Sequence, residues 1–261
     1  MQEFTAKAYD PRDWARRAKR AGMQYVVLTA KHHDGFCLFD SKLTDYKSTN
    51  APCGRDLVRE FVDAVRAEGL RVGLYYSLID WHHPDFPKYN DCNHPMRGDP
   101  AYQDEKIDFD RYLAYMHGQI EELVTNYGRI DILWFDYAYD ELRGEAWRAT
   151  DLIRMVRRHQ PDVIIDNRLE TSGEGFGSLV TEQPAYYSGD FVSPEQILPP
   201  EGIRNVRGER VPWELCTTMN NNWGYSPYDT DYKPASMLIR KLVECVSKGG
   251  NMILNVGPDA N

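Results

Sequence analysis

The sequence places an aspartate, Asp136, directly after the apolar run Ile130–Phe135 and two residues beyond Trp134. A carboxylate at the end of a buried strand can attack an anomeric carbon or hold a metal ion, or it can cap a helix or form a salt bridge. A glycosidase needs a second carboxyl group, about 5–5.5 Å away if retaining and about 6.5–9.5 Å away if inverting. Spacing alone does not choose among the later candidates, which are Glu170, Glu182, Glu195, Glu201 and Glu214.

Histidines offer a second kind of chemistry. Histidine and aspartate side chains could bind Zn²⁺, as in a metal-dependent barrel hydrolase. The candidate ligands are His32, His33, His82, His83, His94, Asp34, Asp80 and Asp136. Neighbouring histidines in an extended segment point to opposite faces, so only one histidine of each pair can readily coordinate the same metal ion. The metal-binding motifs H-x-H and H-E-x-x-H do not occur in the sequence. These spacings make metal catalysis the less favoured alternative, and we expect the imidazoles to hydrogen-bond hydroxyl or backbone groups instead.

Short β-branched or aromatic runs, which favour buried strands, alternate with longer amphipathic segments. The expected strands are Tyr25–Ala30, Arg71–Tyr76, Ile130–Phe135, Asp162–Asp166, Trp213–Met219 and Asn251–Val256, with a further one near Asp190–Ser193. Asp10-Pro11 should begin a first helix that ends at Gly22. Further helices are indicated by apolar stripes from Leu57 to Val65, Phe109 to Leu123, Trp147 to Val156 and Leu238 to Val246.

Strands that alternate with helices predict an α/β fold with a parallel sheet. Neither G-x-G-x-x-G nor a P-loop opens a helix, so a (β/α)8-like TIM barrel is favoured over a nucleotide-binding open sheet. Polar residues follow the strands, at the end where barrel enzymes place their reactive groups. They are His32-His33-Asp34, Asp136, Asn167-Arg168 and Asn255. Residues 78–108 and 169–189 should form irregular loops on that face.

The amino-acid composition disfavours several classes of binding partner. The 261 residues carry 31 Lys and Arg against 40 Asp and Glu, a formal charge of -9, so nucleic acid and an anionic membrane are poor candidates. An apolar run of about 18 residues, which a membrane span needs, is absent, and the N-terminus lacks the apolar core of a signal peptide. The odd number of scattered cysteines, 5, gives no disulfide framework. A neutral ligand fits better, and 12% aromatic residues suit sugar faces.

The motifs YVVLTAKHHDGF, GRDLV, GLYYS, DILWFD, WE…WGY and GGNMILNVGP follow one another along nearly the whole chain. In this order they resemble the retaining alpha-L-fucosidases. The resemblance implies a (β/α)8-like catalytic barrel, usually followed by a β-sandwich. It also implies release of terminal L-fucose from fucosylated glycans, without a metal or organic cofactor.

The resemblance also implies site residues. Asp136 matches the family's nucleophile and Glu195, in GDFVSPE, its acid/base, with Glu214 of the Trp-Glu pair as the alternative. Fucose-binding roles fall on His32, His33, Tyr75, Trp134 and Arg168. The chemistry requires an ionised Asp136, helped by a nearby Arg168, and a protonated Glu195 in drier surroundings.

Two departures from the family pattern concern the ends of the sequence. The family's barrel opens with a strand carrying a His-Trp pair, and this sequence begins at the helix expected after it. We therefore expect about seven strands where a closed barrel needs eight. The sequence also ends inside a motif that normally continues into the next domain. Residues 1–261 are accordingly expected to be an incomplete catalytic barrel without its β-sandwich, weakly active or inactive alone.

Two other classes of function stay open from the residues alone. One is a non-catalytic fucose-binding module, against which the intact Asp136 and Glu195 argue. The other is a metal-dependent barrel hydrolase, which would lose activity on chelation.

Overall fold

The computed structural model describes residues 1–173 and 175–259. Contacts divide the chain into two compact units. Unit 1 comprises Met1–Tyr137 and Trp147–Val163, and unit 2 comprises Ala138–Ala146 and Ile164–Asn261. Both combine parallel strands with helices, so the α/β class predicted from the sequence is confirmed.

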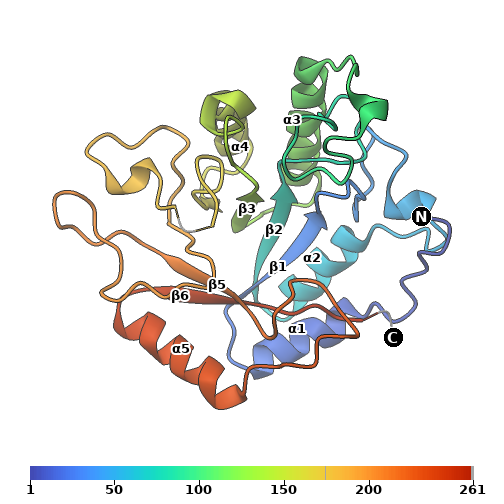
Figure 1. Cartoon of the computed structure of the whole chain (residues 1–261). Helices are drawn as coiled ribbons and strands as arrows, with labels where there is room; N and C mark the ends of the chain where they lie inside the picture. The colour runs from blue at the N-terminus through green and yellow to red at the C-terminus, as the bar shows by residue number, and fades with distance from the viewer. Residues whose placement is uncertain (174, 260–261) are drawn as a thin grey trace. The chain divides into compact units, whose positions relative to one another are not determined.

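Unit 1 contains three parallel strands, β1 (Tyr25–Lys31), β2 (Arg71–Ser77) and β3 (Ile132–Asp136). They lie side by side in this order (Figure 1). Tyr75 pairs with Trp134 and Ser77 with Asp136 in the register of β2 and β3. A parallel sheet brings the carboxyl ends of its strands to one edge, so β1, β2 and β3 all deliver their last residues there.

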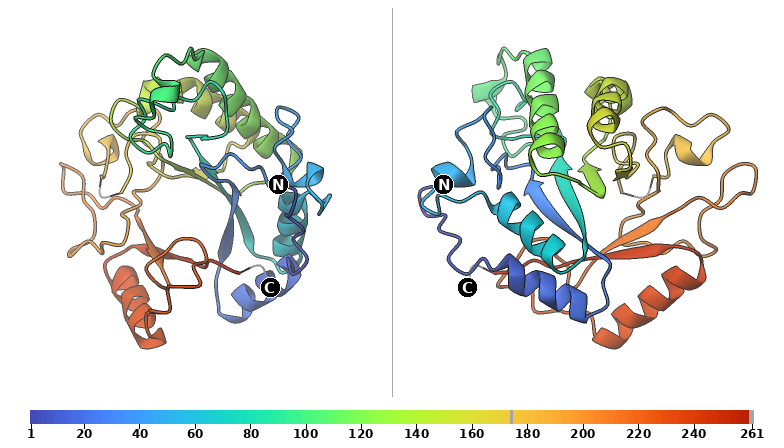
Figure 2. Two further views of the ribbon diagram at one scale, coloured as in Figure 1. Left: turned by 45° about the vertical axis from the view of Figure 1, so that its right-hand side comes forward. Right: turned by 180° about the vertical axis from the view of Figure 1, so that it is seen from behind.

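Three of the four described helices of unit 1 begin at aspartate caps. The four helices are α1 (Pro11–Arg20), α2 (Leu57–Ala67), α3 (Phe109–Asn126) and α4 (Ala149–His159). Side chains of Asp10, Asp56 and Asp108 accept backbone N–H groups at the starts of α1, α2 and α3. Contacts join α1 to α2 and α3 to α4, and both views of Figure 2 show α3 beside α4.

Unit 2 also has a parallel arrangement, of β4 (Ile164–Ile165), β5 (Glu214–Thr218) and β6 (Asn251–Asn255). Between β4 and β5 runs the segment 191–195, joined by parallel bridges Asp166 to Phe191, Val192 to Trp213 and Glu195 to Cys216. The strand expected near Asp190–Ser193 is therefore present as bridges and not as a continuous strand. The strand expected over Asp162–Asp166 is shorter than predicted.

Helix α5 (Ala235–Ser247) forms as predicted, but its expected apolar stripe is not buried. Leu242 and Val246 are 41% and 61% exposed, whereas Cys245 packs into a core with Val192, Trp213 and Leu215. Contacts join α5 to β6, and Figure 1 shows the helix along that strand. Periodicity predicted the helix correctly, but it could not reveal how much of its apolar surface a neighbour covers.

The two expected loops are irregular in the structure. Within 78–108 the chain forms one short 3-10 helix, Pro100–Tyr102, and within 169–189 another, Ser178–Val180. Other 3-10 turns lie at Ser48–Asn50 and Gly144–Trp147, so Trp147 precedes α4 instead of belonging to it. Among the described helices, none combines the length and the hydropathy that crossing a membrane requires.

Candidate active site

A row of aromatic rings crosses the carboxyl ends of the strands of unit 1. The Tyr75 and Trp134 rings are stacked with centroids 5.6 Å apart and planes 19° apart. His32, just after β1, stacks on the other side of Tyr75 at 5.6 Å and 23°. Because Tyr75 and Trp134 are paired in the parallel register, their side chains leave the sheet on the same face. Aromatic rings are amphipathic groups of the kind that pack on sugar rings.

Asp136 ends β3 on the same face as Trp134, two residues earlier. The Tyr75 hydroxyl donates to its Oδ2 at 2.9 Å, and the backbone N–H of Tyr137 donates to its Oδ1 at 2.9 Å. Tyr137 has a φ of 75°, in the left-handed region that residues other than glycine seldom adopt. The two hydrogen bonds fix the orientation of a half-buried carboxylate, and sequence gave no signal for the Tyr137 contribution.

Removing the Tyr75 hydroxyl should weaken any reaction that uses Asp136. In Tyr75→Phe the stacked ring remains and only the hydrogen bond to the carboxylate is lost. A hydrogen bond to a charged group contributes about 1.5–3 kcal/mol, so we expect kcat/KM to fall roughly 10- to 100-fold. Steady-state kinetics on an aryl α-L-fucoside measure this. A parent-like value would show that Tyr75 acts only through its ring.

The two histidines of KHHDGF lie together instead of on opposite faces, which corrects the sequence expectation. Their ring centroids are 3.6 Å apart, because both residues follow the end of β1 and are no longer in an extended strand. Burial lowers the pKa of His32, against the opposing effect of Asp34 and Asp136. Burial, with His32 and Lys31 nearby, lowers the pKa of His33 to about 3. Both imidazoles are therefore neutral near pH 7 and can exchange hydrogen bonds with hydroxyl groups.

The low pKa of His33 should make the free energy of unfolding pH-dependent. An unfolded histidine binds its proton near pH 6.5 and the folded His33 only near pH 3, so the unfolded chain binds more protons between these values. Stability should therefore fall as pH drops from 6.5 toward 3, by up to about 1.4 kcal/mol per pH unit for this group. Denaturant unfolding of the parent and His33→Asn at pH 7, 6 and 5 tests this. A slope no shallower in His33→Asn would contradict it.

Three buried polar atoms near these strand ends have no hydrogen-bond partner among the described residues. They are His33 Nδ1, Ser77 Oγ and Trp81 Nε1. The Trp81 ring contacts the His33 ring, with centroids 4.2 Å apart. Buried polar groups are normally paired, and an unpaired one costs about 1–3 kcal/mol, so these three atoms are unusual for a protein interior. Neither Ser77 nor Trp81 was predicted as a site residue.

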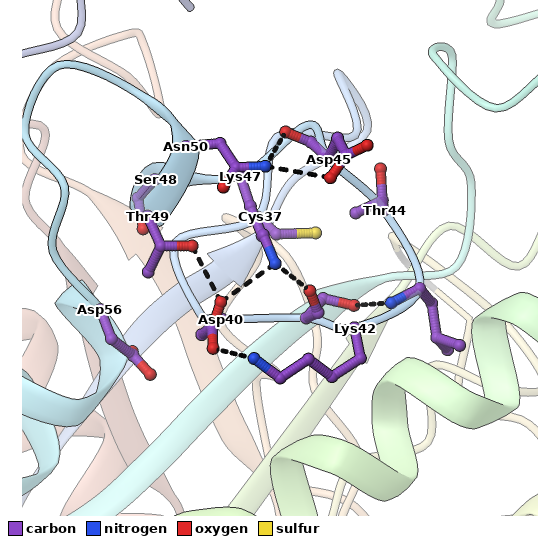
Figure 3. A network of polar contacts seen from close by, with 12 residues as sticks. Cys37, Asp40, Lys42, Thr44, Asp45, Lys47, Ser48, Thr49, Asn50 and Asp56 are labelled. Atoms are coloured by element: carbon purple, nitrogen blue, oxygen red, sulfur yellow. Dashed lines mark hydrogen bonds and ion pairs between the residues drawn. The ribbon is translucent and has the colours of Figure 1, made fainter.

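The loop after the histidines is braced by a polar network, drawn in Figure 3. Asp40 accepts from Lys47 Nζ at 3.0 Å and from Thr49 Oγ1 at 2.9 Å, and it also pairs with Lys42. These hydrogen bonds, that to Lys42 first, hold the pKa of the Asp40 carboxyl well below its usual range. Lys47 Nζ also donates to the Ser41 carbonyl at 2.6 Å. The network keeps the segment that follows His32 and His33 in one conformation.

In unit 2, Arg168 follows β4 and is almost fully buried, with 1% of its side chain exposed. Its Nη1 contacts Glu195 Oε2 at 3.1 Å and its Nη2 donates to the Ser193 carbonyl at 3.0 Å. The proximity of Arg168 to Asp136 stays a prediction, and the contact of Arg168 with Glu195 has no signal in the sequence. The Glu195 side chain is 33% exposed and ion-paired, so the drier surroundings expected for it are not found.

Glu214 and Glu195 lie at different levels along β5 in unit 2. Glu195 lies at the end of the segment 191–195, beside Cys216. Glu214 begins β5, is 5% exposed, and accepts a hydrogen bond from Asn251 Nδ2 at 3.0 Å. Glu214 lies two residues before Cys216 in β5, which places it about 6.6 Å closer to the amino end of the strand.

We find no cluster of side chains suited to bind a metal ion in the part of the chain that the structure describes. Groups of three or more His, Cys, Asp or Glu side chains arranged for a metal ion are absent from residues 1–173 and 175–259. The imidazoles and carboxylates predicted as alternative metal ligands instead contact rings and backbone groups. Asp80, for example, accepts the backbone N–H groups of His82 and His83.

Comparisons with known proteins agree with the motifs. A family model described as alpha-L-fucosidase matches residues 1–261. The chain is similar to alpha-L-fucosidase isoenzyme 1 from Paenibacillus thiaminolyticus, with 58% identity and a TM-score of 0.95 over 99% of this chain and 60% of that one. It is also similar to alpha-L-fucosidase AlfC from Lactobacillus casei in complex with α-L-fucose product, with 32% identity and a TM-score of 0.81 over 98% of this chain and 75% of that one.

Curated relatives give the same family. Plasma alpha-L-fucosidase of Rattus norvegicus is 32% identical over 260 residues, which cover 98% of this chain and 51% of the relative. Plasma alpha-L-fucosidase of Homo sapiens is 30% identical over 98% of this chain and 50% of the relative. The chain thus spans about half the length of the curated relatives it matches. On its motifs and on these matches over its whole length, the chain belongs to the alpha-L-fucosidase family.

Proposed function

We propose that this chain carries the catalytic residues of a retaining alpha-L-fucosidase that releases terminal L-fucose from glycans. The observation that carries the proposal is Asp136. It ends β3 beside the stacked Tyr75 and Trp134 rings, and both of its carboxylate oxygens accept hydrogen bonds. A carboxylate held in one orientation beside a sugar platform is suited to attack an anomeric carbon, because positioning removes much of the entropic cost of the reaction.

In the first step, Asp136 Oδ attacks C1 of the fucosyl residue. The C1–O bond to the leaving group breaks, and Glu195 gives its proton to the departing oxygen. The product is a fucosyl ester of Asp136 with inverted configuration at C1. Glu195 is then a carboxylate, and the Arg168 guanidinium at 3.1 Å stabilises that charge.

In the second step, Glu195 takes a proton from water and the water oxygen attacks C1. The bond from C1 to Asp136 breaks, which regenerates the carboxylate and inverts C1 again, so the configuration is retained overall. The Arg168 guanidinium lies 3.1 Å from the Glu195 oxygen Oε2 during this step. Glu195 is proposed over Glu214 because Glu214 is buried and bonded to Asn251 at the amino end of β5.

Substrate binding is proposed for the remaining residues of the motifs. His32 and His33, neutral near pH 7, would exchange hydrogen bonds with fucose hydroxyls, and Trp134 with Tyr75 would pack on the ring. The unpartnered His33 Nδ1 supports this assignment. Arg168 would contribute to the substrate site through its contact with Glu195. We propose further that residues 1–261 belong to a (β/α)8-like catalytic barrel whose first strand is not among them, supported by polar groups at the carboxyl ends of parallel strands.

The test is release of nitrophenol from 4-nitrophenyl α-L-fucoside by residues 1–261, with and without EDTA. The matched background is the Asp136→Ala variant at the same concentration. Release that is weak but above that background, and unchanged by EDTA, is expected. Fucose binding with no release above background would replace the proposal with a binding module, and loss of release in EDTA would replace it with a metal-dependent hydrolase.

A further inference from the structure

We infer that the buried ion pair between Lys31 and Asp80 is a positioning element that holds the His33 and Trp81 rings in place. Lys31 is 0% exposed and Asp80 is 1% exposed, with Lys31 Nζ 3.1 Å from Asp80 Oδ2. Both residues lie directly beside site elements, Lys31 before His32-His33 and Asp80 before Trp81. Neither contacts Asp136 in the proposed chemistry, so their effect would pass through the rings.

Asp80 fixes the turn that carries Trp81. Its Oδ1 accepts the backbone N–H groups of His82 at 3.0 Å and His83 at 2.9 Å, which closes the chain around Trp81. The Trp81 backbone N–H in turn donates to the His33 carbonyl at 2.7 Å, and the two rings are 4.2 Å apart. The orientation of the His33 ring therefore depends on where Asp80 sits.

Lys31, the last residue of β1, holds the Asp80 side chain in place through their ion pair. The pairing of β1 with β2 shifts register between Thr29 and Lys31, which sets the direction in which the Lys31 side chain leaves the strand. Its Nζ also donates to the Ile79 carbonyl at 3.3 Å and lies 4.5 Å from the centre of the Tyr76 ring. Lys31, Asp80, Trp81 and His33 thus form a closed circuit, since His33 lies two residues after Lys31.

Gly35 shows how tightly this circuit is packed. It has a φ of +82°, and a Cβ built there would lie 2.3 Å from Asp80 Oδ1. The glycine of KHHDGF therefore lets the loop press against Asp80. A buried ion pair is weak evidence for stability, because desolvation offsets most of its attraction, and its best-attested use is to specify one arrangement. Here the arrangement specified is that of the His33 and Trp81 rings.

Gly35→Ala tests the inference against a matched control, Gly22→Ala. Gly22 has nearly the same φ, +80°, but no described atom lies within 4 Å of its Cβ position, so both variants share backbone strain and only one displaces Asp80. We expect kcat/KM on 4-nitrophenyl α-L-fucoside to fall about 100-fold in Gly35→Ala, mostly in kcat, as for a misplacement of about 1 Å. The kcat/KM of Gly22→Ala should stay within about 3-fold of the parent value. The melting temperature should fall in both variants, because both place a Cβ at a positive φ.

A second readout does not need turnover. At pH 5.5 the His33 imidazole of the parent is neutral, because its pKa is about 3, so its carbon-bound protons give the neutral NMR shift. Release of His33 from its buried place in Gly35→Ala should move this signal toward the protonated position, whereas Gly22→Ala should leave it unchanged. Parent-like kinetics and an unmoved His33 signal in folded Gly35→Ala would overturn the inference.

The double variant Lys31→Met with Asp80→Leu covers the case in which Gly35→Ala does not fold. Replacing both charges with apolar groups avoids an unpaired buried charge, although the His82 and His83 N–H groups lose Asp80 Oδ1, so cooperative unfolding is checked first. Because Lys31 itself lowers the pKa of His33, the NMR readout for this variant is the proton–proton NOE between the His33 and Trp81 rings, which should weaken, with a roughly 100-fold lower kcat/KM. A parent-like NOE between the His33 and Trp81 rings would overturn the inference. The kinetic arm rests on the proposed function, but the NMR arm does not, so a displaced signal in a chain without turnover refutes the function alone.

Discussion

Asp136→Ala is expected to lower kcat by at least about 1,000-fold on every α-L-fucoside, including those with good leaving groups. The reason is that the variant lacks the oxygen that bonds to C1, and loss of a covalent nucleophile is among the largest single effects in catalysis. The fold should be retained, because Asp136 is half-buried and its deletion exposes no apolar core. Stopped assays with 4-nitrophenyl α-L-fucoside measure the loss.

Azide makes this prediction specific. A small anion can enter the space that the Asp136 carboxylate leaves and attack C1 directly, in a single displacement. The product of Asp136→Ala with azide is therefore expected to be β-L-fucosyl azide, with inverted configuration. Asp110→Ala serves as the control, because Asp110 is an exposed carboxylate at the start of α3, paired with Arg148. Parent-like turnover in Asp136→Ala, or azide rescue with retained configuration, would remove Asp136 from the nucleophile role.

Glu195→Ala is expected to have the second largest effect, and its size should depend on the leaving group. General acid catalysis contributes about 100- to 10,000-fold, and a poor leaving group needs the proton most. We therefore expect a loss of this size for a fucosyl disaccharide and a much smaller one for the nitrophenyl substrate. Here azide attacks the fucosyl ester of Asp136 without needing a base, so the expected product is α-L-fucosyl azide.

Glu214→Gln is the matched control for Glu195→Ala. The glutamine retains an oxygen that can accept the hydrogen bond from Asn251 Nδ2, so the pairing at the start of β5 and β6 is preserved. Turnover should stay within a few-fold of the parent on both substrates. If Glu214→Gln instead showed leaving-group dependence and azide rescue, the acid/base role would belong to Glu214.

The sequence predicted the elements well because their signals are local. Apolar runs placed β1, β2, β3, β5 and β6, the Asp10-Pro11 cap placed the start of α1, and apolar stripes placed α2 and α3. Asp136 was found for the same reason, since a strand end follows directly from the apolar run. Segment 191–195 was harder, because Pro194 cannot donate to a ladder and the strand is reduced to bridges.

Contacts between elements could not be predicted in the same way. The hydrogen bond from Tyr75 to Asp136 joins positions 61 residues apart and depends on the register of β2 and β3. The contact of Arg168 with Glu195 depends on how the segment 191–195 pairs with its neighbours. The closeness of the His32 and His33 rings depends on the chain leaving the extended conformation after β1. None of these conditions leaves a pattern in the sequence.

The most direct test of the central claim is to trap the covalent intermediate. A 2-deoxy-2-fluoro-L-fucosyl fluoride combines a good leaving group with a destabilised second transition state, so the ester on the enzyme accumulates. Digestion and tandem mass spectrometry then locate the label. The account predicts one label per chain, on Asp136, in the peptide containing ILWFD. A label on any other carboxylate, or turnover of the reagent to inverted product with no label, would contradict it.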